Sequence, residues 1–452
     1  MALNYLATRF TCSWPWSTAV LLCDGRVVCG CADPYAKRVL GDARTASVHD
    51  IWTGPTASGL RQDLNAGGST FCGDCPLKLP LEAEQAAPQR SLDVSPLPTR
   101  MYVECTAACN VSCLDSCCAP ETGITKTRQA GMLDVDLFKR VLAEVGPTLR
   151  RIDFFNYGEA FLHKRAVEMC ELVKREYPHI YLYTSTNGGA LNEESARRLI
   201  RSGIDEVTFS VDGSSPDVYA TYRQRGQFDK VMANLRAATD EKRRLGLDVP
   251  FINWRYILFR WNDNDAEMAR ARQMAESFGV DRLCWEITDH PEHAFSRRFA
   301  PGTDEWRRIR HEIWDDNNLG NAIRGATPRA RIEVRQPTRE ERLTHRSGEP
   351  LALDLRVRNL SRRAFPHTAS YGRRLVRVGA QLLDGGREMR DQDFVRVGLA
   401  SSVDAGGWQD VRMEIPPLPP GEYHLKFDLV SEGIDWFESC GSEVTLRELH
   451  VR

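Results

Sequence analysis

The residues best suited to chemistry lie in Glu104–Cys118, ECTAACNVSCLDSCC, which holds five of the fourteen cysteines of the chain. Cys105, Cys109, Cys113 and Cys117 recur at every fourth position, and Cys118 follows directly. Three thiolates on one short loop can hold three irons of a cubane iron–sulfur cluster and leave the fourth iron open. The open iron can bind a substrate or cofactor, so the spacing predicts chemistry as well as structure.

This stretch resembles the signature of the radical S-adenosylmethionine (SAM) enzymes, a Glu-x-Thr-x-x-Cys-Asn-Leu-x-Cys run at the end of the first barrel strand. The matching residues are Glu104, Thr106, Cys109, Asn110, Val111 and Cys113. The family's third cysteine would fall on Ser116, whereas this chain reads Cys-x3-Cys-x3-Cys. We favour Cys109, Cys113 and Cys117 as ligands. Two other assignments stay open, Cys118 as the third ligand or Cys105–Cys109–Cys113 as the triad, as does a structural zinc knot with Cys105 or Cys118 as fourth thiolate.

Composition limits the number of domains and the kinds of partner that the chain can have. A chain of 452 residues is expected to hold two to four domains, and 42% hydrophobic with 27% charged residues is ordinary for a globular protein. A net charge of −2 argues against nucleic acid as the main partner. No stretch approaches the ~20 apolar residues of a membrane span, and the N-terminal residues lack the pattern of a signal peptide. We therefore expect a cytoplasmic protein without a membrane partner, whose cysteines are thiolate ligands.

A second group of cysteines lies in residues 1–95, around a predicted hairpin, Thr18–Val28, that turns at Asp24-Gly25. This segment is similar to the SPASM/twitch segments that carry auxiliary clusters, although those usually follow the barrel. The resemblance implies at most one auxiliary 4Fe–4S cluster here, with Cys12, Cys29, Cys72 and Cys75 as ligands and Cys31 or Cys23 as substitutes. A zinc-bound or empty relic of the same fold is the alternative.

Residues 96–325 alternate apolar runs with amphipathic helical patterns, which predicts βα units and a parallel sheet. We expect an α/β protein with a partial (β/α)6 TIM-type radical SAM barrel, whose chemistry lies at the carboxyl ends of the strands. The predicted strands are Arg100–Glu104, Arg151–Asn156, Ile180–Thr184, Glu206–Val211, Phe251–Phe259 and Arg282–Ile287.

Residues 326–452 change character, with alternating runs separated by Gly and Pro turns that predict an antiparallel β-sandwich. We favour a packing or dimerisation module over a glycan-binding site, and keep a homodimer among the expected partners. The runs are Leu353–Val357, Val376–Leu383, Val411–Ile415, Tyr423–Val430 and Val444–Val451.

The radical SAM resemblance implies cofactor contacts at several strand ends. Tyr157, Gly158 and Glu159 stand where the family has a Gly-Gly-Glu run that supports the SAM amino group. Ser210 and Asp212 match the pair that bonds the ribose hydroxyls. The remaining expected cofactor contacts are Arg223, at the SAM carboxylate, and Asn187 and Asn262.

Substrate contacts are expected from polar residues on the strands, because such residues are costly to bury without a partner. An amino sugar is cationic and would suit a carboxylate. The expected substrate-binding residues are Glu104, Asn253, Arg255, Trp285, Glu286 and His290, and those expected to be catalytic are Glu104, Tyr157 and Glu286.

The Cys-x3-Cys-x3-Cys spacing resembles that of the radical SAM diol dehydratases of aminoglycoside (apramycin) antibiotic biosynthesis. The resemblance implies a lyase in which a 5′-deoxyadenosyl radical takes the C4′ hydrogen of paromamine, a pseudodisaccharide, and the C3′ hydroxyl is lost to give a 4′-keto-3′-deoxy product. It also implies a flavodoxin-type electron donor and a downstream nicotinamide-dependent reductase. The alternatives are a radical SAM dehydrogenase or epimerase on an aminocyclitol, a peptide maturase, and a non-catalytic carbohydrate-binding scaffold with a structural cluster.

Overall fold

The computed structural model describes most of the chain and divides it into two compact units, Met1–Phe299 and Ala300–Arg452. The described residues are 7–31, 33, 35–82, 84–114, 128, 131–247, 249–288, 291–314, 328–336, 342–361, 364–368, 375–432 and 435–452. Cys117, Cys118, Asp289 and His290 lie outside these residues.

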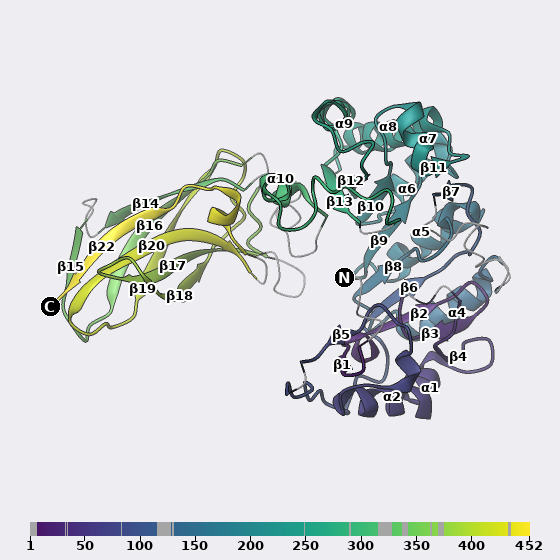
Figure 1. Cartoon of the computed structure of the whole chain (residues 1–452), viewed down its shortest axis with the longest axis horizontal. Helices are drawn as coiled ribbons and strands as arrows, with labels where there is room; N and C mark the ends of the chain where they lie inside the picture. Colours follow the sequence, from purple (N-terminus) through teal and green to yellow (C-terminus); the bar gives the residue numbers. More distant parts are fainter. Residues whose placement is uncertain are drawn as a thin grey trace. The chain divides into compact units, whose positions relative to one another are not determined.

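The first unit is built on one nine-stranded mixed sheet in the order β13-β12-β10-β9-β8-β6-β2-β3-β4 (Figure 1). Its six predicted parallel strands all form, and their pattern is consistent with a partial TIM-type barrel. They are β6 (Arg100–Val103), β8 (Arg151–Asp153), β9 (Tyr181–Thr186), β10 (Glu206–Ser210), β12 (Phe251–Leu258) and β13 (Arg282–Ile287).

Helices follow these strands, as the amphipathic patterns predict. Asp134, Asn192 and Asn264 cap α4, α6 and α9 by accepting backbone N–H groups of the first turn. The helices of this unit are α1 (Val48–Thr53), α2 (Pro55–Asn65), α4 (Val135–Val145), α5 (Ala166–Glu176), α6 (Glu193–Arg201), α7 (Pro216–Tyr222), α8 (Phe228–Arg244) and α9 (Asp265–Phe278). Short 3-10 turns cover Trp14–Trp16, Thr70–Cys72 and Ala160–Leu162.

The N-terminal segment extends the barrel sheet. Strand β2 pairs in parallel with β6, while β3 and β4 continue as antiparallel strands. The predicted hairpin at Asp24-Gly25 is therefore present, but residues 1–95 and the barrel share a sheet and belong to one compact unit. The strands are β2 (Thr18–Leu21), β3 (Arg26–Val28) and β4 (Val39–Asp42), with the small pairs β1 (Phe10–Thr11) with β5 (Leu79–Pro80) and β7 (Ser112–Cys113) with β11 (Arg223–Gln224).

The second unit contains two sheets, of order β14-β16-β19 and β15-β22-β20-β17-β18, with β21 paired to β20. Buried side chains of both sheets form one apolar cluster. Each predicted alternating run lies in a strand. The strands are β14 (Ala330–Gln336), β15 (Arg342–His345), β16 (Leu351–Asn359), β17 (Val376–Asp384), β18 (Met389–Gly398), β19 (Trp408–Ile415), β20 (Gly421–Ser431), β21 (Asp435–Trp436) and β22 (Thr445–Val451); the helical pieces are α10 (Asp304–Ile309), Arg310–Glu312 and Phe437–Cys440.

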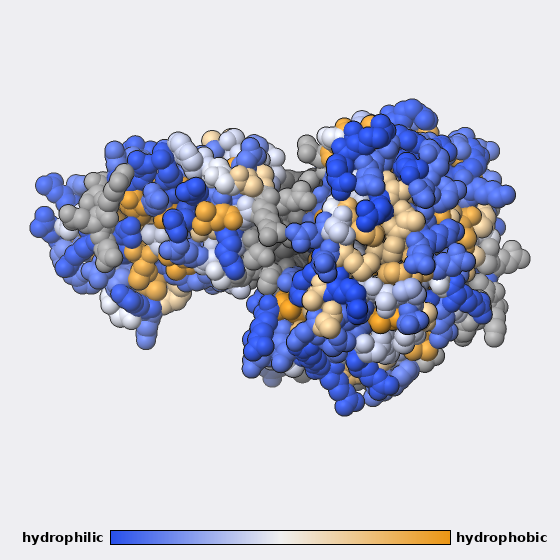
Figure 2. All heavy atoms as spheres, turned by 90° about the horizontal axis from the view of Figure 1, so that it is seen from above, coloured by the Kyte–Doolittle hydropathy of each residue, from blue (hydrophilic) through white to orange (hydrophobic). Residues whose placement is uncertain are grey.

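Figure 2 shows a mostly hydrophilic surface on the visible face of each unit, broken by smaller hydrophobic patches. No helix among the described residues is both long and apolar enough to cross a membrane.

Candidate active site

The cysteine loop after β6 is fixed by short strand pairing and by side chains from three other strand ends. Cys113 lies on β7, which pairs with β11, so that Cys113 is opposite Arg223. The Arg223 Nη1 donates to Cys113 Sγ over 3.4 Å, and Asn187 Nδ2 donates to Cys109 Sγ over 3.6 Å. Donors aimed at both sulfurs suit thiolates that carry negative charge.

Gly158 brings the loop after β8 against the backbone of the cysteine loop. Its φ is +81°, and a Cβ there would lie 2.2 Å from the carbonyl oxygen of Thr106. The next residue, Glu159, donates its backbone N–H to Ala108 over 2.8 Å. A side chain at position 158 would therefore push the two loops apart, which explains glycine at this position.

Glu159 organises the end of β9 through a buried carboxylate. Its Oε1 accepts a 2.7 Å bond from Thr186 Oγ1, and its Oε2 accepts a 2.8 Å bond from the backbone N–H of Asn187. Burial raises the pKa of Glu159, although these bonds oppose the shift. Asn187 in turn donates to Asn110 Oδ1 over 2.9 Å, so this chain of bonds reaches the cysteine loop.

Asp212, after β10, is fully buried and already engaged. Arg223 Nε donates to Asp212 Oδ2 over 2.6 Å, and the backbone N–H of Ile257 donates to Oδ1 over 2.7 Å. Burial alone would lower the pKa of Arg223, but the Asp212 carboxylate and Cys113 hold it well above its usual value. In this structure the pair links β10 to the cysteine loop, and the expected ribose and carboxylate contacts of Asp212 and Arg223 stay predictions.

Asn262 has a similar role in the loop after β12. It is buried, accepts from the backbone N–H of Phe259 over 2.7 Å, and donates to the carbonyl oxygens of Ile257 and Asp212 over 3.1 and 3.3 Å. These bonds satisfy its amide and hold the loop after β12, and the expected cofactor contact of Asn262 stays a prediction.

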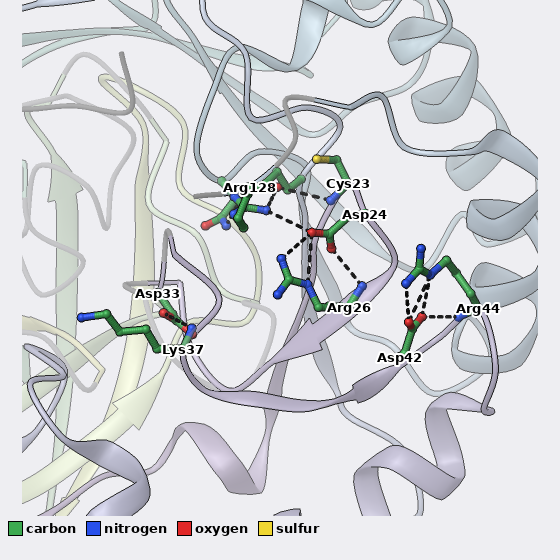
Figure 3. A network of polar contacts seen from close by, with 10 residues as sticks. Cys23, Asp24, Arg26, Asp33, Lys37, Asp42, Arg44 and Arg128 are labelled. Carbon is green, nitrogen blue, oxygen red and sulfur yellow. Dashed lines mark hydrogen bonds and ion pairs between the residues drawn. The ribbon is translucent and has the colours of Figure 1, made fainter. Parts of the chain in front are cut away.

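Glu104 is engaged in a closed ion pair. Arg128 donates to both carboxylate oxygens over 2.8 Å, and further bonds come from the backbone N–H of Cys23 and from Asn156 Nδ2. Figure 3 shows Arg128 also reaching toward Asp24, which bonds Arg26 on the β2–β3 hairpin. Glu104 therefore joins the N-terminal hairpin to the barrel, and this arrangement does not support the expected catalytic or substrate-binding role.

Arg255 and Glu286 face the interior from β12 and β13. Arg255 Nε lies 3.0 Å from Glu286 Oε2, and Arg255 Nη2 donates to Ser210 Oγ over 3.1 Å. Ser210 also bonds Ser185 on β9 at 3.3 Å. The two charged side chains keep 24% and 31% of their surface exposed, so the structure brings three of the expected residues into one accessible polar group.

Two expected substrate residues lie elsewhere. Asn253 bonds Glu206 and Arg282, which begin β10 and β13, so it sits at the amino ends of the strands, away from the cysteine loop. Trp285 is buried on the opposite face of β13 from Glu286 and packs on Tyr256 with ring centroids 5.4 Å apart. Neighbouring strand residues point to opposite faces, so Trp285 and Glu286 cannot line the same cavity.

Tyr157 is half-buried in the loop between β8 and Gly158. His290 and Cys117, the expected third cluster ligand, are outside the described residues. Three contributing residues were not singled out from the sequence: Ser185, Thr186 and Arg128. Ser185 lies on β9 and Thr186 ends it, so the predicted strand could have indicated both residues. Arg128 follows no strand or helix pattern, so the sequence gave no signal for it.

The N-terminal cysteines converge on one cavity. It is lined by the four expected ligands together with Trp14, Arg38 and Lys78, among others, and neither Cys23 nor Cys31 is part of the lining. Burial and, to a smaller extent, the neighbouring thiols Cys75 and Cys12 raise the pKa of Cys72 to about 12, against the opposing effect of Arg38 and Lys78. Mutual repulsion of this kind is relieved when the sulfurs bind iron. The ligands expected here are Cys12, Cys29, Cys72 and Cys75.

Comparison with known proteins identifies the class of two domains in this chain. Residues 103–270 match the family model described as "Radical SAM superfamily", and residues 12–76 match SPASM, an "Iron-sulfur cluster-binding domain". The chain therefore contains a radical SAM domain with a SPASM domain before it. These domains imply a 4Fe–4S cluster that works with SAM, plus an auxiliary cluster.

Individual relatives match parts of the chain. The GTP 3′,8-cyclase of Petrotoga mobilis is 28% identical over 169 residues, 37% of this chain and 49% of that protein. The tungsten-containing aldehyde ferredoxin oxidoreductase cofactor-modifying protein of Pyrococcus furiosus is 35% identical over 114 residues, 25% of this chain and 30% of that protein. The chain thus spans half or less of the length of these two relatives.

Among solved structures, Streptococcus suis SuiB bound to S-adenosylmethionine is 11% identical, with a TM-score of 0.34 over 50% of this chain and 45% of that one. A TM-score at this level does not establish a shared overall fold.

Proposed function

We propose that this protein is a radical SAM enzyme that acts on an amino-sugar substrate, and specifically a diol dehydratase on a paromamine-like pseudodisaccharide. When bound, the cluster and SAM supply a 5′-deoxyadenosyl radical that abstracts a substrate hydrogen. Cys109 and Cys113, with Cys117 as the expected third ligand, would hold the cluster, while Arg223 and Asn187 donate to the described sulfurs.

The observation that carries the substrate class is the Arg255–Glu286 pair. Its two charges lie 3.0 Å apart, and both side chains are partly exposed. A partly exposed pair presents both charges to a bound molecule: Glu286 can accept from a substrate ammonium, and Arg255 can donate to a hydroxyl. Ser210, held by Arg255 and Ser185, supplies a neutral hydroxyl beside them. Sugars are recognised by dense hydrogen bonding of this type.

In the proposed reaction, hydrogen abstraction at C4′ is followed by loss of the C3′ hydroxyl as water and addition of one electron and one proton, which gives the 4′-keto-3′-deoxy product. A flavodoxin-type donor would supply electrons, and a nicotinamide-dependent reductase would consume the ketone. We place this chemistry in the cytoplasm, where thiolates stay reduced. The C-terminal sheets, as the β-sandwich expected from the sequence, are proposed as a packing module that also supports a homodimer.

A dehydrogenase or epimerase acting on an aminocyclitol is the second candidate, and one observation favours it. The auxiliary cysteine cavity would give a place for an electron removed from the substrate. The two candidates differ in product mass, because dehydration removes water and dehydrogenation removes two hydrogens.

The test uses anaerobic, cluster-reconstituted protein with SAM, dithionite and paromamine, and follows 5′-deoxyadenosine and sugar mass. We expect 5′-deoxyadenosine together with a sugar lighter by one water. A sugar lighter by two hydrogens would establish the dehydrogenase, and absence of SAM cleavage with every amino sugar would overturn the proposal. Glu286→Gln should raise KM at least about tenfold with less change in kcat, since it removes a charge from ground-state and transition-state binding alike.

A further inference from the structure

The loop after β10 is held by one buried carboxylate on α9, that of Glu267. Its Oε1 accepts bonds from the backbone N–H of Ser214 over 2.8 Å, from the Ser214 hydroxyl over 2.7 Å and from the Tyr256 hydroxyl over 3.0 Å. Its Oε2 accepts from Arg270 over 2.7 Å, and Arg270 also donates to the Ser214 hydroxyl over 2.9 Å. Glu267 therefore joins α9 to a loop position two residues beyond Asp212.

The rest of this loop is fixed by neighbouring strands and by α7. Trp254 Nε1 donates to the carbonyl oxygen of Val211 over 2.7 Å, and the bonds to Asp212 described above hold the next residue. A Cβ on Gly213 would lie 2.4 Å from the backbone nitrogen of Tyr219, so α7 packs directly against the loop backbone. Each residue of the loop thus has its own contact, and Glu267 supplies the last of them.

A series of bonds leads from this loop to the cysteine loop. Asp212 Oδ2 accepts from Arg223 Nε over 2.6 Å, and Arg223 Nη1 donates to Cys113 Sγ over 3.4 Å. The backbone N–H of Leu114 donates to the carbonyl oxygen of Tyr222 over 3.0 Å and extends the pairing of β7 with β11. A shift of the loop after β10 would therefore reach a sulfur of the cysteine loop.

We propose that Glu267 is a positioning residue for SAM binding: it fixes the loop after β10, so that Arg223, held by Asp212, stays against the cysteine loop. The inference rests on the radical SAM part of the proposed function and on no choice of sugar. Among the described residues the Glu267 carboxylate bonds Ser214, Tyr256 and Arg270, so it acts on the cysteine loop through other residues.

The carboxylate suits this role because it stays ionised. Burial would raise the pKa of Glu267, but the bonds from Ser214, Arg270 and Tyr256 hold that pKa below its usual value. Bonds to an ionised acceptor are stronger than bonds between neutral groups, and one oxygen here accepts three of them. An uncharged side chain without an oxygen would leave the same donors buried and unpaired.

Helix α9 does not need this carboxylate to form. Asn264 caps the helix by accepting the backbone N–H of Glu267 over 3.0 Å. Met268, Ala271 and Ala275 are buried along one face of the helix and hold it in place. Loss of the carboxylate should therefore loosen the loop after β10 while the helix remains packed.

The first measurement is SAM binding, by equilibrium dialysis with anaerobic, cluster-reconstituted protein and no sugar. Glu267→Leu keeps the approximate size of the side chain but removes both acceptor oxygens, so the loop should hold its position only part of the time. If that fraction is about one tenth, the apparent Kd for SAM rises about tenfold, and we expect at least this rise with iron content unchanged. Glu267→Gln keeps an oxygen for Ser214 and should restore binding to within about threefold of wild type.

The second measurement separates positioning from a general loss of stability. Amide hydrogen exchange of the same proteins, without SAM, is followed by mass spectrometry in peptides that cover residues 109–114, residues 210–226 and α9. In Glu267→Leu we expect faster exchange in the loop after β10 and at the β7–β11 pair, and an unchanged rate in α9. A role limited to stabilising the helix would change the exchange of α9 and leave the cysteine loop as it is.

Asp265→Asn is the matched control. Asp265 lies on the first turn of the same helix, but its largely exposed carboxylate bonds Arg298 over 2.6 Å, so the variant should bind SAM within about twofold of wild type. If Glu267→Leu does not fold, Glu267→Asp, whose side chain is shorter by one methylene, takes its place in both measurements.

Three outcomes would overturn the inference alone: normal SAM binding with unchanged loop exchange in Glu267→Leu, equal weakening in Asp265→Asn, or no rescue by Glu267→Gln. Absence of SAM binding by the wild-type protein would instead overturn the proposed function, and this inference with it.

Discussion

The apolar core of the second unit and the inner side of the first unit's sheet bury different side chains, although the second unit also buries the Asp428 carboxyl. The shared core of the second unit consists of aliphatic and aromatic residues together with methionine. The inner side of the nine-stranded sheet instead buries charge, including Glu104, Asp153 and Asp212, each fully inaccessible. Burying a carboxylate is costly unless it is paired and bonded, and each of these three is. On this side of its sheet, the first unit therefore has paired buried charges in place of apolar packing, where it must hold reactive groups in position.

The largest expected effect is loss of a cluster ligand. Cys113→Ser should reduce SAM cleavage by at least about a thousandfold, because the cluster would lose one of its three ligands. The measurement is 5′-deoxyadenosine by liquid chromatography together with iron content. Cys170→Ala is the control: Cys170 lies on the buried face of α5 and should be replaceable with cleavage largely retained. Equal loss in both variants would show that the effect is general misfolding.

The second largest expected effect is a loss of stability when the buried Glu104–Arg128 ion pair is broken. Glu104→Gln removes the carboxylate charge that the inaccessible Arg128 contacts at 2.8 Å and leaves Asp24 at 4.0 Å, so it should destabilise the first unit by about 3–5 kcal/mol. Thermal unfolding followed by circular dichroism would measure the shift. The exposed pair Asp42–Arg44 offers the contrast, and Asp42→Asn should leave the unfolding temperature nearly unchanged. A harmless Glu104→Gln would contradict the joining role assigned to this residue.

A substitution in the core of the second unit should lower the free energy of unfolding without changing the rate of SAM cleavage. Leu429→Ala opens a cavity in its apolar core and should cost about 2–5 kcal/mol of unfolding free energy. The rate of 5′-deoxyadenosine formation at a temperature where the protein is folded should not change. Leu360→Ala, at a position 45% exposed, is the control for size and should cost little. A large fall in SAM cleavage by Leu429→Ala would mean that the second unit takes part in the chemistry.

The smallest expected effect is a pH dependence within the second unit. Burial and, to a smaller extent, the Glu438 carboxylate raise the pKa of Asp428 from 3.8 to about 7, against the opposing effect of the backbone N–H groups that bond it. The folded carboxyl thus binds its proton more tightly than the unfolded one. Stability should be fully present below about pH 4 and fall as pH rises to 7, by about 2 kcal/mol between pH 5 and 7.

Urea unfolding of the whole chain at pH 5, 6 and 7 checks this behaviour. Asp428→Asn should flatten the dependence, because the amide does not titrate in this range. An unchanged slope in the variant would assign the pH dependence to other groups.

Much of the fold could be predicted from the sequence, because burial of a strand leaves a recognisable pattern of apolar residues. Buried parallel strands give short apolar runs, and all six predicted barrel strands form close to their expected bounds. The same holds for the alternating runs of the second unit. Pairing of β2 with β6 was not readable, because strand pairing between distant segments depends on edges that carry no local signal.

The site was predictable at the level of strand ends, and less so at the level of side chains. Side chains alternate between the two faces of a strand, so the predicted strand β13 could already have placed Trp285 and Glu286 on opposite faces. The partners of Asp212 and Glu104 could not be foreseen, since Arg223 reaches Asp212 from the short strand β11 and Arg128 reaches Glu104 across 24 positions of sequence, and both contacts depend on tertiary packing.

The central claim is that the first unit directs radical chemistry to one carbon of an amino sugar. Its most direct test is turnover with paromamine deuterated at C4′, followed by mass spectrometry of the nucleoside. We predict deuterium in 5′-deoxyadenosine and a sugar product lighter by one water. Unlabelled 5′-deoxyadenosine formed alongside a changed sugar would contradict abstraction at C4′, and unlabelled nucleoside with unchanged paromamine would contradict the substrate itself.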